Sequence, residues 1–188
     1  MKTKLHTKSG LMMLLFILFS LMACTNSKNK NQAETVKAPA LDINAATFLG
    51  DLEAVQQHIK AGSDLNVKEP MAGSTPLITA AMFGKTDVAL ALINAGADLD
   101  LANNDGSTAL HCAAFLCRTE IVEALLKHGA NKDLRNNYGA TALESVAGPF
   151  DEVKGIYDEF AKNLGPLGLK LNYKRLEETR PVIANMLQ

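Results

Sequence analysis

Short apolar segments alternate with polar turns along residues 41–188. In two of these segments the apolar residues Leu90 and Ile93, and then Val122, Leu125 and Leu126, stand three or four positions apart, which is the spacing of one helix face. Helices of about eight to ten residues are too short to persist alone in water. The pattern therefore predicts an all-α fold in which short helices are stabilised by stacking on their neighbours.

The segments recur at a fixed interval. Copies of one tripeptide stand at 75–77 (TPL), 108–110 (TAL) and 141–143 (TAL), and Gly73, Gly106 and Gly139 each precede a copy by two positions. A second motif reads VALALINAGAD at 88–98 and IVEALLKHGAN at 121–131, and a shorter copy stands at 55–64. The interval from Gly62 to Gly96 is longer by one position than that from Gly96 to Gly129, and the extra residue falls in the turn around 67–72.

This arrangement resembles the ankyrin repeat, with a period of about 33 residues and Thr-Pro-Leu-His, Ala-Ala and Gly-Ala-Asp motifs that the chain follows over about 110 residues. The motif is degenerate, since 75–78 reads TPLI and 108–111 reads TALH. The resemblance implies about four stacked helix-turn-helix units, an all-α ankyrin-repeat solenoid with N- and C-terminal caps. It also implies that the chain binds a protein partner.

Capping residues stand at the expected helix ends. Thr75, Thr108 and Thr141 suit the N-cap of each first helix, where a hydroxyl accepts a free backbone N–H. Gly50 and Gly84 occupy the break between the two helices of a unit, where glycine tolerates a left-handed conformation. Cys117 stands at this break in the third unit, and we expect a locally altered turn there.

The N-terminal segment 1–23 is typical of a signal peptide. Lys2, Lys4 and Lys8 precede an apolar run over 11–23. Such a run spans about 20 Å as a helix, which is shorter than a bilayer core of about 30 Å. Its end, Leu21-Met22-Ala23-Cys24, resembles the lipobox of bacterial lipoproteins, which implies cleavage before Cys24 and a diacylglycerol on that thiol. An ordinary signal peptide with a cysteine near its end is the alternative.

These features divide the chain into four parts: a signal peptide at 1–23, a lipidated flexible tether at 24–40, ankyrin repeats at 41–163 and a C-terminal helical cap at 164–188. We expect residues 151–163 to be the second helix of the fourth unit. Residues 172–188 are expected to form a helical pair in which Pro181 begins a helix. The lipobox resemblance, with Thr25 after the cysteine, favours a cell-envelope location, lipid-anchored at the outer membrane and facing the periplasm.

Charge and motifs narrow the function. Removal of the predicted signal peptide takes away Lys2, Lys4 and Lys8 and no acidic residue, and the acidic balance that is left argues against nucleic acid as a partner. We find no motif of a hydrolase, zinc protease or P-loop enzyme, and expect no enzyme activity and no cofactor.

Zinc could in principle be held by four side chains, those of His111, Cys112, Cys117 and His128. His111 and Cys112 are adjacent and their side chains diverge on a helix, so we expect structural roles and no metal. The family resemblance implies that His111 bonds neighbouring backbone. A disulfide between Cys112 and Cys117 is the alternative to two free thiols.

The candidate binding surface follows from the resemblance. In ankyrin proteins the turn tips and the residues before the mid-repeat glycine line a concave face, which here gives Phe48, Leu49, Met71, Ser74, Met82, Phe83, Asn104, Asp105, Ser107, Phe115, Leu116, Asn137 and Tyr138. Six of these residues form three apolar pairs, Phe48-Leu49, Met82-Phe83 and Phe115-Leu116. The pairs either form one exposed ladder along the concave face, or one member of each pair packs between repeats.

The sequence thus predicts a monomeric, membrane-anchored protein-binding module, acting as an inhibitor or immunity protein. An accessory role in periplasmic oxidative-stress defence, a structural protein that binds cell wall, and a small metal-binding protein or enzyme are the alternatives.

Overall fold

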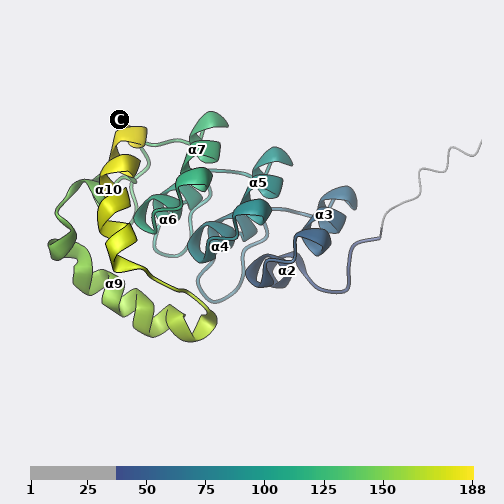
Figure 1. Ribbon diagram of the computed structural model, residues 1–188. Helices are drawn as coiled ribbons and strands as arrows, with labels where there is room; N and C mark the ends of the chain where they lie inside the picture. The colour runs from purple at the N-terminus through teal and green to yellow at the C-terminus, as the bar shows by residue number, and fades with distance from the viewer. Residues whose placement is uncertain (1–36) are drawn as a thin grey trace, which may run out of the picture. The chain divides into compact units, whose positions relative to one another are not determined.

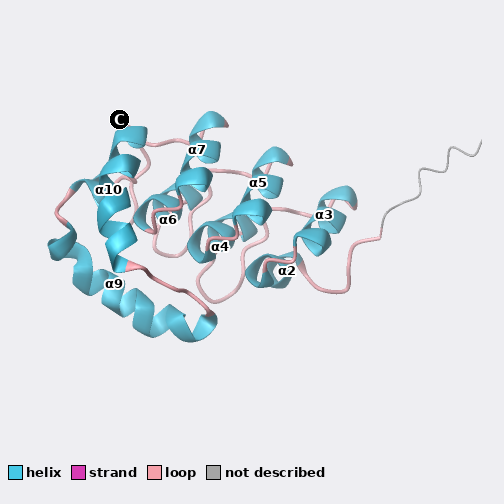
Figure 2. Ribbon diagram, in the orientation of Figure 1, coloured by secondary structure: helices cyan, strands magenta, loops and turns pink. Residues whose placement is uncertain are grey.

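The computed structural model describes residues 37–188, so the predicted signal peptide, the lipobox with Cys24 and most of the tether lie outside the described residues. The described part contains helices and no strand (Figure 2). In chain order the elements are α2 (Ile43–Leu49), α3 (Leu52–Lys60), α4 (Pro76–Phe83), α5 (Thr86–Asn94), α6 (Ala109–Phe115), α7 (Thr119–Lys127), α8 (Glu144–Ala147), α9 (Phe150–Leu164), the 3-10 helix η1 (Gly165–Leu167) and α10 (Tyr173–Leu187). None of the helices in this part is both long and apolar enough to cross a membrane.

The helices of residues 37–188 form two rows that step along one axis (Figure 1). One row contains α2, α4, α6 and the short α8, each packed on the next. The other row contains α3, α5 and α7, followed by α10, which packs on α7. Each pair of helices therefore borrows its stability from the adjoining pair, and the predicted all-α solenoid is confirmed.

The predicted N-caps lie at equivalent places in successive units. Thr75 and Thr108 are the N-caps of α4 and α6, where their hydroxyls accept hydrogen bonds from the Ile78 amide at 3.3 Å and the His111 amide at 3.5 Å. The Thr141 hydroxyl accepts from the Glu144 amide at 3.2 Å, but α8 begins only at Glu144, so Thr141 is not its N-cap. The alanine pairs that follow, at residues 80–81 and 113–114, are fully buried. Their small side chains let helices of one row approach each other closely, which fixes the step of the stack.

The turn at Cys117 keeps the left-handed conformation of the corresponding glycines, but α6 ends one residue earlier than α4, because Leu116 is its C-cap whereas Gly84 is the C-cap of α4. Gly50 has φ 78°, Gly84 has φ 66°, and Cys117 adopts the same left-handed conformation with φ 54°. The next residue closes the turn in the same way, since the Lys85 amide bonds the Ala80 carbonyl at 2.9 Å and the Arg118 amide bonds the Ala113 carbonyl at 2.8 Å. Burial of the Cys117 side chain offsets the strain of this conformation, which is of order 1 kcal/mol.

The C-terminal part differs from the expectation. The predicted helix at 151–163 exists as α9, but α10 and not α9 takes the second-helix place in the last unit. Helix α10 packs on α7 as α7 packs on α5. Each of these helices has a cation at or near its start that bonds a carbonyl in the preceding unit: Lys85 Nζ donates to the Leu49 carbonyl, Arg118 Nη2 to the Met82 carbonyl and Arg175 Nη2, from α10, to the Cys117 carbonyl. Each cation stabilises the carbonyl end of the preceding unit's first helix. Helix α9 is therefore an insertion between the two helices of the last unit.

Pro181 does not begin a helix, because α10 is one continuous helix with Pro181 inside it. A proline there removes one helical hydrogen bond. Arg180, before it, and Ile183, two positions after it, are buried and hold the helix against the stack. Leu187 is buried as well.

Candidate protein-binding groove

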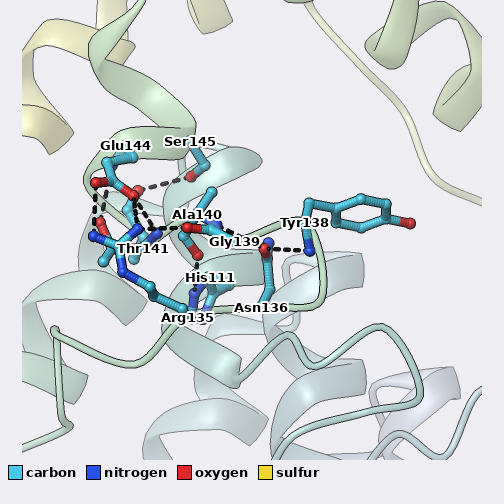
Figure 3. A network of polar contacts seen from close by, with 10 residues as sticks. His111, Arg135, Asn136, Tyr138, Gly139, Ala140, Thr141, Glu144 and Ser145 are labelled. Atoms are coloured by element: carbon cyan, nitrogen blue, oxygen red, sulfur yellow. Dashed lines mark hydrogen bonds and ion pairs between the residues drawn. The ribbon is translucent and has the colours of Figure 1, made fainter.

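Each pair of units is joined by a tight hairpin loop organised around one side chain. Asn103 Oδ1 accepts hydrogen bonds from the amides of Asp105 and Ser107 at 3.0 and 2.9 Å. Asn136 does the same one unit later, accepting from the amides of Tyr138 and Ala140 at 3.0 and 3.1 Å (Figure 3). An acceptor at the base of each loop therefore fixes the shape of the tip.

The first hairpin contains the extra residue that the sequence placed at 67–72. Here Glu69 replaces asparagine, and its carboxylate accepts from the amides of Met71, Ala72 and Ser74 at 2.7, 2.7 and 3.0 Å. Partial burial opposes the charged form, but the backbone N–H groups together hold the pKa of Glu69 below its usual value.

Backbone and amide contacts tie neighbouring hairpin tips together. The Asn104 amide donates to the Ala72 carbonyl at 2.8 Å, and Asn104 Nδ2 donates to the Met71 carbonyl at 3.2 Å. Asn137 repeats both contacts one unit on, bonding the carbonyls of Asp105 and Asn104, each at 2.9 Å. These asparagines were predicted to contact a partner, but their side-chain N–H groups already serve to hold the tips in one row.

His111 connects the third and fourth units, as the family resemblance implied. Its Nδ1 accepts from the Thr108 amide at 3.3 Å, and its Nε2 lies 3.1 Å from the carbonyl of Ala140 in the next hairpin. Since Nδ1 accepts from an N–H, Nε2 carries the proton and donates to Ala140. Burial lowers the pKa of His111, although its bonds to backbone carbonyls act in the opposite direction. The neutral ring is thus part of the frame of the groove.

An ion pair holds the third and last hairpin against α8. The Arg135 guanidinium contacts both carboxylate oxygens of Glu144, at 2.6 and 3.0 Å, and it also donates to the Gly139 carbonyl (Figure 3). The Glu144 carboxylate accepts from the Thr141 amide at 2.9 Å. These hydrogen bonds, above all the one from Arg135, lower the pKa of Glu144. The charge of Glu144 is therefore balanced locally.

Helix α9 covers the end of α6. The Tyr157 ring is fully buried and stacks on the Phe115 ring with centroids 4.3 Å apart. The Tyr157 hydroxyl donates to the Phe115 carbonyl at 2.6 Å, and Phe160 lies 5.4 Å from the same ring. Leu116 is only 2% exposed. The third apolar pair is consequently buried in part by the chain itself, which favours the alternative in which the pairs do not form one continuous exposed ladder.

A groove with a volume of about 470 Å³ lies between the hairpin tips, α6 and α9. Six of the predicted binding residues line it: Met82, Asp105, Ser107, Phe115, Leu116 and Tyr138. Helix α9 adds a wall that sequence reasoning missed, made of Val153, Ile156, Glu159 and Phe160. The apolar spacing within α9 was visible in the sequence, but nothing there indicated that this face lies beside α6.

The other predicted residues lie elsewhere. Phe48 and Phe83 pack edge to face with centroids 4.9 Å apart, so part of each ring serves the contact between units. Ser74 is buried, so it offers almost no surface to a partner. Leu49 is exposed and Met71 is 89% exposed, the latter on the tip of the first hairpin. Asn104 and Asn137, between these places, form the contacts of the hairpin row.

The cysteine and histidine side chains proposed as metal ligands are separately engaged. Burial raises the pKa of Cys112 to about 12 and that of Cys117 to about 11, and both are free thiols. Cys117 Sγ lies 3.7 Å from the Leu176 carbonyl, and His128 Nδ1 bonds the Ala124 carbonyl at 2.8 Å. Within residues 37–188 no group of three or more His, Cys, Asp or Glu side chains could hold a metal ion.

The stacked helix pairs, the hairpin row and the groove beside it define a helical repeat solenoid. A family model described as ankyrin repeats (3 copies) matches residues 43–147, which is more than half of the chain. The chain belongs to the ankyrin-repeat family.

Curated relatives match parts of the chain. Protein phosphatase 1 regulatory subunit 27 of Homo sapiens and that of Mus musculus are each 41% identical over 64 residues, covering 34% of this chain and 41% of the relative. The DNA-binding protein RFXANK of Homo sapiens is 32% identical over 76 residues, covering 39% of this chain and 29% of the relative. The chain thus spans less than half the length of these relatives.

Proposed function

We propose that this protein is a lipid-anchored binding module of the cell envelope that grips a protein partner in the groove between the hairpin tips and α9. The observation that carries the proposal is the groove itself, with its aromatic and methionine side chains on a frame fixed by backbone hydrogen bonds. A volume of about 300 to 1,000 Å³ is typical of pockets that bury a ligand or a few side chains. Aromatic anchors in such hollows contribute much of the energy of protein interfaces.

The surface extends beyond the groove, which favours a macromolecule over a small ligand. Tyr138 is 78% exposed on the last hairpin tip, where its ring points away from the hydrogen-bonded network (Figure 3). Exposed Met71 lies further along the same row of tips. A partner segment lying along the stack would contact the tips and insert side chains into the groove.

Regulation by steric block is the form of binding that we favour. The name of one relative describes it as a phosphatase regulatory subunit, which supports a role in controlling another protein. A rigid ankyrin frame can cover a partner's active surface without providing chemistry, as an inhibitor or immunity protein does. The predicted lipid on Cys24 would confine that activity to a membrane surface, with the outer membrane facing the periplasm as our proposal.

The experiment compares variants of the groove by crosslinked affinity capture from membranes. Tyr138→Ser with Ile156→Asn removes two exposed apolar side chains that line the groove. The matched control is Leu167→Ser with Val182→Asn, which removes apolar side chains of similar exposure that do not line it. We expect the groove variant to lose specific partners that the wild type and the control both retain.

Recovery of the same partners by the groove variant would show that the groove is not the binding surface. The anchor is tested separately by metabolic labelling with radioactive palmitate, which we expect to label the wild type and not the Cys24→Ala variant. Equal labelling of the two would contradict lipidation at Cys24.

A further inference from the structure

The charged side chains of the groove all have the same sign. The ionisable acids that line it are Asp105, Glu144 and Glu159, and no lysine or arginine is among its lining residues. Glu144 is neutralised by the Arg135 guanidinium at its back. Asp105 and Glu159 are both exposed, and neither carboxylate has an ion-pair partner among the described residues.

These two carboxylates come from different walls of the groove. Asp105 stands on the hairpin tip between α5 and α6, and Glu159 stands on α9. The residues of α6 that line the groove, among them Cys112 and Phe115, form its floor. The negative charge of Asp105 acts on this floor, because it adds to burial in raising the pKa of the Cys112 thiol. Apolar side chains lie in the same hollow, among them Phe115, Ile156 and Phe160.

Resting on the proposed function, we infer that the groove accepts a loop or end of a protein partner in which an arginine or lysine stands beside a large apolar side chain. The apolar side chain packs against the aromatic floor, and the cation is balanced by Asp105 and Glu159. Arginine suits the site better than lysine, because its planar guanidinium can stack on an aromatic ring such as Tyr138 while it bonds a carboxylate.

Nucleic acid does not fit this surface, because its phosphates would meet two uncompensated carboxylates. A small organic cation would fill only the groove and leave the row of hairpin tips unused. A polypeptide uses both, since its side chains enter the groove while its backbone runs along the tips. Charge complementarity of this kind contributes to specificity and to the rate of association.

The probe for this inference is a phage-displayed library of random heptapeptides closed by a disulfide, selected against the full-length protein in detergent. We expect the selected peptides to be enriched in arginine or lysine next to leucine, methionine or an aromatic residue. A representative peptide then binds Asp105→Asn with Glu159→Gln about tenfold or more weakly than the wild type in calorimetry, and its affinity for the wild type falls as salt is raised.

Matched variants separate the failure of this inference from the failure of the groove. Asp87→Asn with Glu123→Gln removes an exposed Asp and an exposed Glu that do not line the groove, and we expect it to bind as the wild type does. Selected peptides without basic residues, or equal binding to the Asp105/Glu159 variant, overturn the charge inference. If Tyr138→Ser with Ile156→Asn also leaves binding unchanged, the groove proposal falls with it. Circular dichroism confirms that each variant is folded.

Discussion

The hydroxyl of Tyr157 donates a 2.6 Å hydrogen bond to the backbone carbonyl of Phe115, and this contact joins residues 42 positions apart. It attaches α9, which interrupts the last ankyrin unit, to the end of α6. Because Val153, Ile156 and Phe160 are on the same helix, the contact also determines where one wall of the groove stands. The buried Tyr157 side chain therefore fixes the position of the inserted helix α9, and with it one wall of the candidate binding site.

Tyr157→Phe should loosen this wall. The change keeps the ring on Phe115 but leaves the Phe115 carbonyl without its donor and Arg180 without one of its acceptors. Loss of a buried hydrogen bond of this kind costs about 1 to 3 kcal/mol. We expect faster amide hydrogen exchange in α9. Tyr173→Phe is the control, because its hydroxyl bonds Asp158 at an exposed site, and equal exchange in the two variants would contradict the role of the Tyr157 hydroxyl.

The turn between the two helices of a unit contains glycine at position 84 and cysteine at the equivalent position 117. Exchanging these residue types tests how much each turn depends on its residue. Cys117→Gly relieves a left-handed cysteine and loses a buried thiol, so the free energy of unfolding should change by no more than about 1 kcal/mol. Gly84→Cys adds the same strain, and its Cβ would come within 2.8 Å of the Arg118 guanidinium.

We therefore expect Gly84→Cys to be destabilising by about 1 to 3 kcal/mol in urea unfolding. Equal losses in the two variants would show that Cys117 is held by specific contacts of its thiol and not merely tolerated. This comparison uses the repeat itself as the control, because both positions close the same turn with the same backbone hydrogen bond.

Features that repeat along the chain could be predicted from the sequence. The constant interval between copies located the threonine caps, the glycine turns and the alanine pairs, because each of these meets a local backbone or packing need. The role of His111 followed from its place in the motif, and Thr108 and Ala140 do bond its ring. Local rules suffice where every unit has the same neighbours.

The insertion could not be predicted in this way. Helix α9 has an apolar face of ordinary spacing, and that face fits a second helix of a unit as well as it fits a groove wall. Its position is decided by contacts with no sequence signature, such as Tyr157 on Phe115 and Arg180 on the Gly148 carbonyl. The predicted helix start at Pro181 was wrong for the same reason. Buried residues near Pro181 hold a helix with an internal proline against the stack, and their burial depends on tertiary contacts that the sequence pattern does not show.

Acid should weaken the fold through His111. Burial lowers the pKa of His111 below its ordinary value of 6.5, so as pH falls below about 7 the unfolded chain takes up a proton before the folded chain does. The stabilising contribution is complete above pH 6.5 and is lost as pH falls towards the folded pKa. We expect the urea midpoint of the wild type to fall between pH 7.5 and pH 5.5.

The control for this titration is His111→Gln, whose amide can still donate to the Ala140 carbonyl but does not titrate. Its midpoint should be lower than that of the wild type at pH 7.5 and should change less between the two pH values. A midpoint difference between the two proteins that is the same at both pH values would contradict a lowered pKa for His111.

Arg180 offers the sharpest test of how the last unit is held together. Its guanidinium is 2% exposed and donates to the Ser145 carbonyl at 3.2 Å, the Tyr157 hydroxyl at 3.0 Å and the Gly148 carbonyl at 3.1 Å. These acceptors belong to α8, α9 and the turn between them. Arg180→Met keeps much of the side-chain length and removes every donor, leaving buried acceptors unsatisfied.

Burying a guanidinium is itself costly, which offsets part of what its hydrogen bonds contribute, so we expect a net loss of about 2 to 4 kcal/mol for Arg180→Met. In a solenoid each unit contacts only its neighbours, so the damage should remain local. Hydrogen exchange should therefore rise in α8, α9 and α10 while α2 to α5 keep the protection of the wild type. A uniform rise along the whole stack would instead mean that residues 37–188 unfold as one cooperative unit, with Arg180 stabilising helices that it does not touch.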